Sequence, residues 1–180
     1  MLKAEPVVNS MRRLAYTAFG DGSPVPGATT VQPYSKSDAV FAPYPVTKLL
    51  TQPKISSDYT GSNVASFDME SIAHGCFVAL QQGAVAPALS CTIRYIGIKA
   101  GSGKKVIVDK EFKITKPGLY GLSTGPETLQ KVIFKDEDDL KGLVSLEPSI
   151  LEPTILVVKG VVAQMGFDEI AYTAHVRDDA

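Results

Sequence analysis

The sequence predicts an all-β fold, an antiparallel β-sandwich or jelly-roll-like domain with long, proline-rich N-terminal loops. No helical 3.6-residue pattern of apolar residues persists beyond two turns, whereas short alternating segments recur between turn signals. The 180 residues include 15 glycines and 12 prolines, which divide the chain into short segments. A chain of this length buries one core well, so we expect a single domain.

The clearest strand pair lies over residues 91–98 and 105–114. Cys91, Ile93 and Tyr95 share one face, and Gly97 then shifts the phase, as a bulge does, so that the isoleucines at 96 and 98 face inward. The second strand alternates regularly, and the segment G-S-G at 101–103 predicts the turn between the two. The apolar face of the second strand carries Val106, Val108, Phe112 and Ile114.

Further strands are expected at residues 66–78, 130–135, 154–162 and 167–176. In the last of these, alternate positions form an apolar face of Ile170, Tyr172, Ala174 and Val176. Two copies of a five-residue repeat, 146–150 and 151–155, each contain a Glu-Pro pair. We expect this repeat to form an extended connection stiffened by proline.

The first 65 residues differ from the rest of the chain. They hold seven of the twelve prolines and four of the seven tyrosines. Because proline donates no hydrogen bond to a sheet, we expect residues 1–65 to form edge strands and long loops. Residues 66–178 are then expected to form the core of the sandwich.

Composition and charge exclude several classes of function. With 44% apolar and 21% charged residues, the chain is typical of a globular protein and not of a disordered or fibrous one. A net charge of -1 provides no basic surface for nucleic acid. The longest aliphatic run, residues 155–158, is far too short to span a bilayer. We therefore expect neither a nucleic-acid partner nor a membrane partner.

The two cysteines, Cys76 and Cys91, help to decide the compartment. A Gly- and Pro-containing stretch between them lets the chain double back, so we expect a disulfide, with two reduced core cysteines as the alternative. A metal site is disfavoured because His74 and His175 stand in no ligand spacing. Residues 1–6 contain no apolar segment of the secretory kind, so the protein is either cytosolic or has lost a signal peptide.

Two short motifs surround the cysteines. The segment F-D-M-E-S at 67–71 runs to Gly75 and Cys76, and S-C-T-I at 90–93 leads to Gly97. With the closing strand at 167–173, this pattern resembles small secreted, effector-like and mostly uncharacterised proteins of filamentous ascomycete fungi. The resemblance covers roughly residues 55–176 and implies secretion, a disulfide between Cys76 and Cys91, and a jelly-roll-like domain. Glu169 departs from it, because it stands where that family has asparagine.

The search for catalytic residues gives one match. The segment G-L-S-T-G at 121–125 fits G-x-S-x-G, and Asp168 and His175 follow in the order of an α/β-hydrolase. That nucleophile needs a strand, a sharp turn and then a helix, whereas prolines stand on both sides of Ser123. We therefore predict a loop at Ser123, a surface histidine at 175, no catalytic residue and no enzymatic activity.

Two other motifs suggest ligands. The segment G-S-G-K-K at 101–105 lacks the first glycine and the Ser/Thr of a phosphate loop, so it predicts a hairpin turn. The four acids 136–139, D-E-D-D, offer oxygen ligands to calcium but lack the spacing of an EF-hand loop. We expect a solvated loop or a helix start from Asp136 to Asp139, with calcium left open, and predict no metal and no cofactor.

The segment A-V-F-A-P-Y-P-V at 39–46 suggests a binding loop. Apolar side chains on a backbone stiffened by proline lose less entropy on docking. We predict a partner-binding site here, with coverage of one end of the core by the two aromatic residues as the alternative. Its predicted residues are Phe41, Pro43, Tyr44 and Pro45.

The sequence thus favours a secreted, fungal effector-like, non-catalytic protein that binds a host extracellular protein. Its most concrete version inhibits a plant papain-like cysteine protease. The second hypothesis is a carbohydrate- or cell-wall-binding jelly-roll module. The chain has no tryptophan for an aromatic platform, but Tyr34, Tyr44 and Tyr59 could serve.

Overall fold

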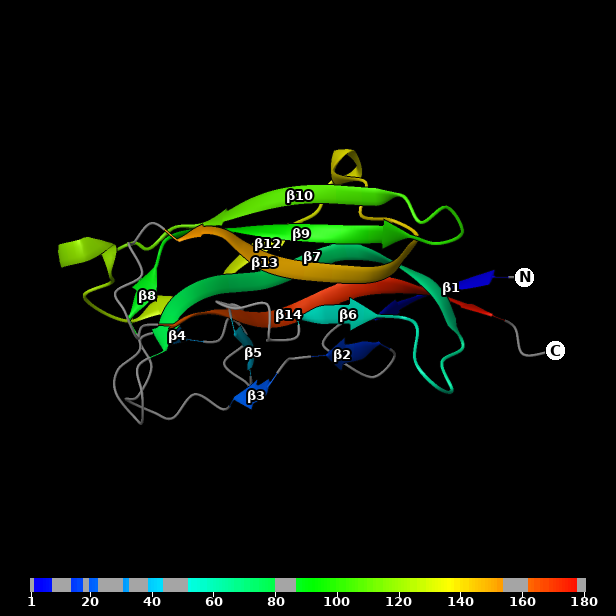
Figure 1. Ribbon diagram of the computed structural model, residues 1–180, viewed down its shortest axis with the longest axis horizontal. Helices are drawn as coiled ribbons and strands as arrows, with labels where there is room; N and C mark the ends of the chain where they lie inside the picture. The colour runs from blue at the N-terminus through cyan, green and yellow to red at the C-terminus, as the bar shows by residue number, and fades with distance from the viewer. Residues whose placement is uncertain are drawn as a thin grey trace.

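The computed structural model describes residues 2–7, 14–17, 20–22, 31–32, 39–43, 52–79, 87–153 and 162–177. In these ranges antiparallel strands dominate, and most of them join in one sheet that curls into a half-barrel (Figure 1). The all-β prediction is therefore confirmed, whereas the sandwich or jelly-roll form and the proline-rich loops are not. Within the same ranges no helix is both long and apolar enough to cross a membrane.

The main path across the sheet runs from an outer strand, β10, to the short strand β3. Its members, in spatial order, are β10 (Lys105–Phe112), β9 (Cys91–Lys99), β13 (Leu143–Pro153), β7 (Val64–Ala79), β14 (Val162–Arg177), β5 (Ala39–Pro43) and β3 (Gly20–Gly22). Five short strands lie off this path, and four of them pair with its members: β1 (Leu2–Val7) pairs with β14, β6 (Lys54–Ser56) with β13, and β8 (Ala88–Leu89) and β12 (Gln130–Ile133) with β7. β2 (Ala15–Thr17) pairs with β6, and β4 (Val31–Gln32) pairs in parallel with β11 (Glu127–Thr128).

Strands β9 and β10 form the hairpin that the alternation predicts. Their register runs unbroken from the pair Lys105 and Ile98 to the pair Phe112 and Cys91. In β9 every second side chain is buried from Cys91 through Gly97. The predicted bulge at Gly97 is therefore wrong, and the isoleucines at 96 and 98 are half-buried on the other face.

Gly97 is required for close packing, not for a change of phase. A Cβ atom at this position would lie 2.8 Å from Cδ2 of Leu143 and 3.2 Å from Cδ2 of Leu140. Both leucines are fully buried in the core and have no room to move aside. The glycine thus lets β9 pass close to the chain that enters β13.

We expect Gly97→Ala to lower the free energy of unfolding by about 1 to 3 kcal/mol, because it overfills this part of the core. Urea unfolding of the variant and the wild type measures the difference. The matched control is Gly125→Ala, since a Cβ there would meet only Cδ of Lys116, at 3.8 Å. A Gly97→Ala protein as stable as the wild type would show that the packing is looser than described.

Strand β13 contains the first repeat copy and the start of the second, so the predicted connection is wrong up to residue 153. Pro148 lies opposite Tyr95, and Pro153 lies opposite Cys91. Odd-numbered residues of β9 turn their backbone groups toward β10, since Lys99 N–H donates to the Lys104 carbonyl at 2.9 Å and the pattern alternates. The nitrogens of Pro148 and Pro153, which lie opposite such residues, therefore face away from β9. Neither proline is required to donate a hydrogen bond to the ladder with β9.

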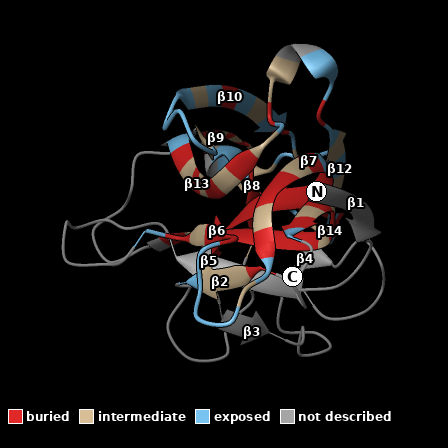
Figure 2. Cartoon of the chain, turned by 90° about the vertical axis from the view of Figure 1, so that its right-hand side faces the viewer, coloured by how far each residue is buried: buried red, intermediate tan, exposed pale blue. Residues whose placement is uncertain are grey.

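The core lies inside the curl of the sheet, as the buried residues in Figure 2 show. Its largest fully buried side chains are aromatic, namely Tyr95, Tyr172, Phe67, Phe112 and Phe167. The predicted disulfide is present: Cys76 of β7 is bonded to Cys91 of β9, and both residues are buried. In the sheet, β13 lies between these two strands, so the disulfide fixes one part of the curl to another.

Strand β14 bends at Glu169. Its register with β7 shifts between Asp168 and Ala171, and Glu169 adopts a left-handed φ of 44°. Asparagine adopts this region more readily than glutamate does. Glu169 holds this conformation while its carboxylate pairs with Lys131 at 3.1 Å.

The described segments of the first 65 residues add short strands to the sheet. β1 and β5 both pair with β14, and β6 pairs with β13. Of the other predicted strands, 66–78, 130–135 and 167–176 correspond to β7, β12 and the end of β14. The predicted strand at 154–162 lies outside the described residues except at 162.

Candidate functional site

The segment 115–125, between β10 and β11, forms a narrow hairpin that carries the short 3₁₀ turn η1 (Leu119–Gly121) at its tip. At its base, the buried carboxylate of Glu127 accepts the backbone N–H groups of Thr115 and Lys116 at 2.9 and 3.0 Å. The same carboxylate accepts the Thr115 hydroxyl. Hydrogen bonds to a charged carboxylate are stronger than those between neutral groups. Glu127 therefore fixes the position at which the hairpin leaves the sheet.

Backbone hydrogen bonds close the hairpin above this base. The N–H of Thr124 donates to the Lys116 carbonyl at 3.0 Å, and the N–H of Gly118 donates to the Leu122 carbonyl at 2.7 Å. A Cβ at Gly118 would collide with Cγ2 of Thr124, so the two sides of the hairpin approach closely here. Gly121 has a φ of 71°, which is the left-handed region that favours glycine.

One side of the hairpin is also bonded to the core. Ser123 N–H donates to the Ala88 carbonyl at 2.8 Å, and Ala88 N–H donates back to Oγ of Ser123 at 2.9 Å. Ala88 belongs to β8, whose next residue, Leu89, pairs with the disulfide-bonded Cys76. The hairpin is therefore connected through β8 to the disulfide.

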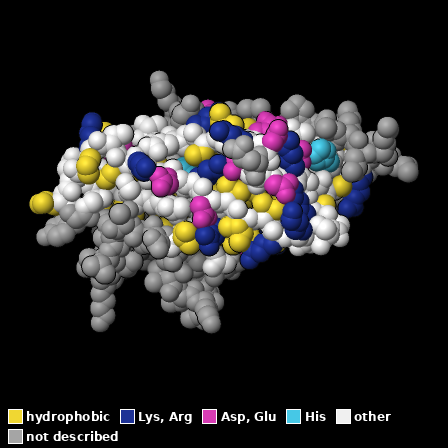
Figure 3. Space-filling model, turned by 90° about the horizontal axis from the view of Figure 1, so that it is seen from above, with side chains coloured by type: hydrophobic (Ala, Val, Ile, Leu, Met, Phe, Trp, Pro, Cys, Tyr) yellow, Lys and Arg dark blue, Asp and Glu magenta, His cyan; other side chains and the backbone are white. Residues whose placement is uncertain are grey.

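The tip of the hairpin exposes an apolar side chain. Leu119 is 84% exposed, the highest value among the large apolar residues that the structure describes. η1 lies at one end of the long axis of the molecule, and hydrophobic side chains are visible at that end from above (Figures 1 and 3). An exposed leucine on a pre-organised backbone is a feature of a docking loop, because the ordering entropy has already been lost on folding.

The residues of the G-x-S-x-G match do not assemble a catalytic site. The Ser123 hydroxyl accepts the Ala88 N–H, and His175 pairs with Asp68 at 3.0 Å. Along β7, His175 lies opposite residue 66 and Ala88 lies opposite residue 77, so about 36 Å of strand, measured along its path, separates these two positions. The interpretation of residues 121–125 as a loop is confirmed.

The acidic segment 136–139 begins with the short 3₁₀ turn η2 (Asp136–Asp138). Lysine ammonium groups bind its aspartates: Lys141 donates to Asp136 at 2.6 Å, Lys110 to Asp138 at 2.8 Å and Lys99 to Asp139 at 2.6 Å. The hydrogen bonds from Lys141 and Lys99 lower the pKa values of Asp136 and Asp139. Acidic and basic side chains lie side by side on this face (Figure 3), and among the described residues no group of His, Cys, Asp and Glu is arranged to hold a metal.

The predicted binding segment 39–46 is described only in part. Phe41 and Pro43 belong to β5, which pairs with β14 on one side and with β3 on the other. The prediction of a loop is therefore wrong for residues 39–43, because their backbone is part of the sheet. Tyr44, Pro45 and also Tyr34 lie outside the described residues, and the binding role of the segment stays a prediction.

The sequence predicts a loop at residues 121–125 but does not single out Leu119. The available signal was an apolar pair, leucine and tyrosine, directly after the Pro-Gly turn at 117–118. This pair does not by itself tell a side chain that packs on the core from one that faces solvent.

The chain was also compared with known proteins. No family model, curated protein or solved structure matches it. Its function is therefore inferred from the geometry of its own residues.

Proposed function

We propose that the protein is a secreted, non-catalytic binding protein that inserts the tip of the hairpin 115–125 into an apolar pocket of a partner protein. The observation that carries this proposal is Leu119, which is 84% exposed on a hairpin whose backbone is held by Glu127, Gly118 and Ser123. A rigid loop that projects one apolar side chain loses little entropy on binding. The disulfide between Cys76 and Cys91 fits an oxidising, extracellular setting.

The partner we propose is a host extracellular hydrolase, with a papain-like cysteine protease as the most concrete member. A loop whose ends are hydrogen-bonded to the core resists the extended conformation that proteolysis requires, so it can occupy a substrate cleft without being cut. Pro117 next to the tip removes one backbone donor in addition. Lys116 is exposed beside the tip, which favours a pocket with an acidic rim.

We expect the wild-type protein to inhibit papain in a titration, and Leu119→Asp to weaken inhibition by about 30-fold or more, as for a central interface residue. Since the side chain of Leu119 is almost fully exposed, the melting temperature should change little. The matched control is Ile133→Asp, which places the same charge at another exposed apolar residue, on β12.

Two results would contradict this proposal. Equal losses for Leu119→Asp and Ile133→Asp would show that the hairpin tip is not the contact. No inhibition of papain by the wild type, at concentrations far above that of the enzyme, would overturn the inhibitor version.

A further inference from the structure

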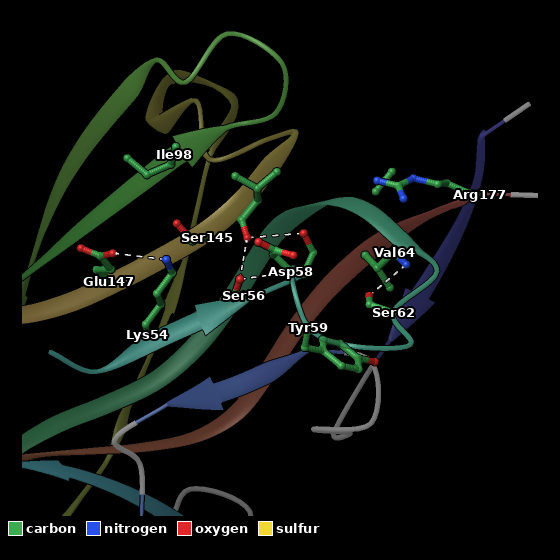
Figure 4. Close-up of a pocket in the computed structure, with 13 residues that line it drawn as sticks. Lys54, Ser56, Asp58, Tyr59, Ser62, Val64, Ile98, Ser145, Glu147 and Arg177 are labelled. Carbon is green, nitrogen blue, oxygen red and sulfur yellow. Dashed lines mark hydrogen bonds and ion pairs between the residues drawn. The ribbon is translucent and has the colours of Figure 1, made fainter. Parts of the chain in front are cut away.

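A cleft of about 380 Å³ lies where β6, β13 and the start of β7 diverge (Figure 4). It is distinct from the hairpin: η1 lies at one end of the long axis, and the turn at 57–63 lies toward the other (Figure 1). Its walls are rich in hydroxyl groups, contributed by Ser56, Ser57, Ser62 and Ser145. Its size is within the range of small-molecule sites.

Some of these hydroxyls hold the walls in place. Ser56 and Ser57 both donate to the Val144 carbonyl, at 3.3 and 3.4 Å, and Ser56 Oγ accepts the N–H of Asp58 at 3.0 Å. Ser62 Oγ accepts the N–H of Val64 at 3.2 Å. The turn that forms one side of the cleft is therefore hydrogen-bonded to β13 and to itself before any ligand enters.

Other polar groups of the cleft are not used in this way. Ser145 is only 3% exposed as a residue, and its hydroxyl, which lines the cleft, makes no hydrogen bond to another described residue. Within the same part of the chain, the Asp58 carboxylate, the Tyr59 hydroxyl and the Arg177 guanidinium likewise have no side-chain partner. These four groups line the open cleft and are not taken up by other side chains, so a ligand in the cleft can hydrogen-bond to them in place of water.

The charges of the cleft indicate a neutral ligand. Lys54 and Glu147 pair with each other at 3.9 Å, and Asp58 and Arg177 carry opposite single charges. The four formal charges cancel. An anion such as phosphate would be attracted by Arg177 but repelled by Asp58, which has no counter-ion of its own in the described residues.

We propose that this cleft binds a neutral sugar unit. A carboxylate accepts hydrogen bonds from sugar hydroxyls, a guanidinium donates to them, and a serine hydroxyl does both. Tyr59, which is 39% exposed, offers an aromatic ring against which the C–H groups of a sugar can pack. The site thus supplies an acceptor, a donor and an apolar surface, and it does not depend on the hairpin 115–125.

The test is saturation-transfer NMR with glucose and N-acetylglucosamine as neutral probes, and galacturonate and inorganic phosphate as charged ones. We expect saturation transfer to at least one neutral sugar at millimolar concentration. Asp58→Asn should weaken that binding about tenfold or more, because it removes charge-assisted hydrogen bonds while keeping the side-chain shape. Ser145→Ala should also weaken it, without loss of stability, since its hydroxyl has no partner to lose.

Leu119→Asp is the matched control and should bind the sugar as the wild type does, so failure here and failure of the docking hairpin are distinguishable. No transfer to either neutral sugar would overturn the proposal. So would stronger binding of galacturonate or phosphate, or binding that Asp58→Asn leaves unchanged.

Discussion

The double variant Cys76→Ala/Cys91→Ala should lose about 3 kcal/mol of its free energy of unfolding. The disulfide closes a loop of 15 residues, and without it the unfolded chain gains the corresponding freedom. Because both cysteines are buried, the alanines that replace them stay out of contact with water in the folded variant. No gain in hydration of the folded state therefore offsets the loss. For a chain of this size the melting temperature should fall by about 6 to 12 °C.

Thermal unfolding with and without dithiothreitol provides the control. Reduced wild type should approach the melting temperature of the double variant, and the reductant should leave the variant unchanged. The result that would contradict a stabilising role of the disulfide is a reduced wild type, with both thiols shown to be free by titration, that melts at the same temperature as the oxidised protein. Because Ser123 is bonded to Ala88 in β8, which pairs with Cys76, we also expect faster amide exchange in the hairpin of the variant.

The second large effect concerns His74, which is fully buried in β7. Its Nε2 lies 3.3 Å from the Glu111 carbonyl, and its Nδ1 lies 2.7 Å from the Tyr95 hydroxyl. A carbonyl oxygen only accepts, so the neutral ring carries its proton on Nε2 and accepts the Tyr95 O–H at Nδ1. The imidazole thus connects β7 to β9 and to the outer strand β10.

Acid should destabilise the protein through His74. Burial lowers its pKa from 6.5 to about 4, with the Glu111 carbonyl opposing the shift and Lys110 adding to it. Between these two pH values the unfolded state binds a proton that the folded state does not, so stability is full above pH 6.5 and falls as the pH drops toward 4. Over this range the loss is about 3 kcal/mol.

Urea unfolding at pH 7.5 and at pH 4.5, roughly the limits of this titration, measures the loss. His74→Gln keeps a donor for the Glu111 carbonyl but does not titrate, so most of the decrease should disappear. His175→Gln is the matched control, because His175 is the other histidine of the chain and pairs with Asp68 near the surface. An unchanged decrease in His74→Gln, or its disappearance in His175→Gln, would show that another group is responsible.

The strands could be predicted where burial alternates along one segment. The alternation over 91–98 and 105–114 predicts β9, β10 and their turn, since the cause of the pattern lies within the two strands. Gly97 could not be interpreted in this way. Glycine is needed at position 97 because Leu143, in another strand, packs against it. A pattern within one strand cannot distinguish such a contact from a bulge.

Proline in β13 misled the prediction for a similar reason. Proline in a strand is tolerated where its nitrogen faces away from the ladder, and that depends on the register with β9. The register is a property of two strands that are far apart in the sequence. Pro148 was therefore assigned to a connection, although it is a buried strand residue opposite Tyr95.

The sites were harder to predict than the strands. The exposure of Leu119 depends on hydrogen bonds that fix the base of the hairpin: Glu127 accepts the N–H of Thr115, and Ser123 is bonded to Ala88. The cleft brings together Asp58, Ser145 and Arg177, which lie in separate parts of the sequence. Of the residues that line it, only Tyr59 is anticipated from the sequence, as one of three tyrosines for a sugar site.

The most direct test of the docking hairpin is amide hydrogen exchange of residues 115–125, in the free protein and in a mixture with papain. In the free protein we expect the N–H groups of Gly118, Ser123 and Thr124 to be protected, since each donates to a backbone carbonyl. In the mixture the amides at the tip, around Leu119, should exchange more slowly as well. A hairpin that exchanges at the rate of an unfolded chain when free, or that is unchanged by the protease, would contradict a pre-organised docking loop.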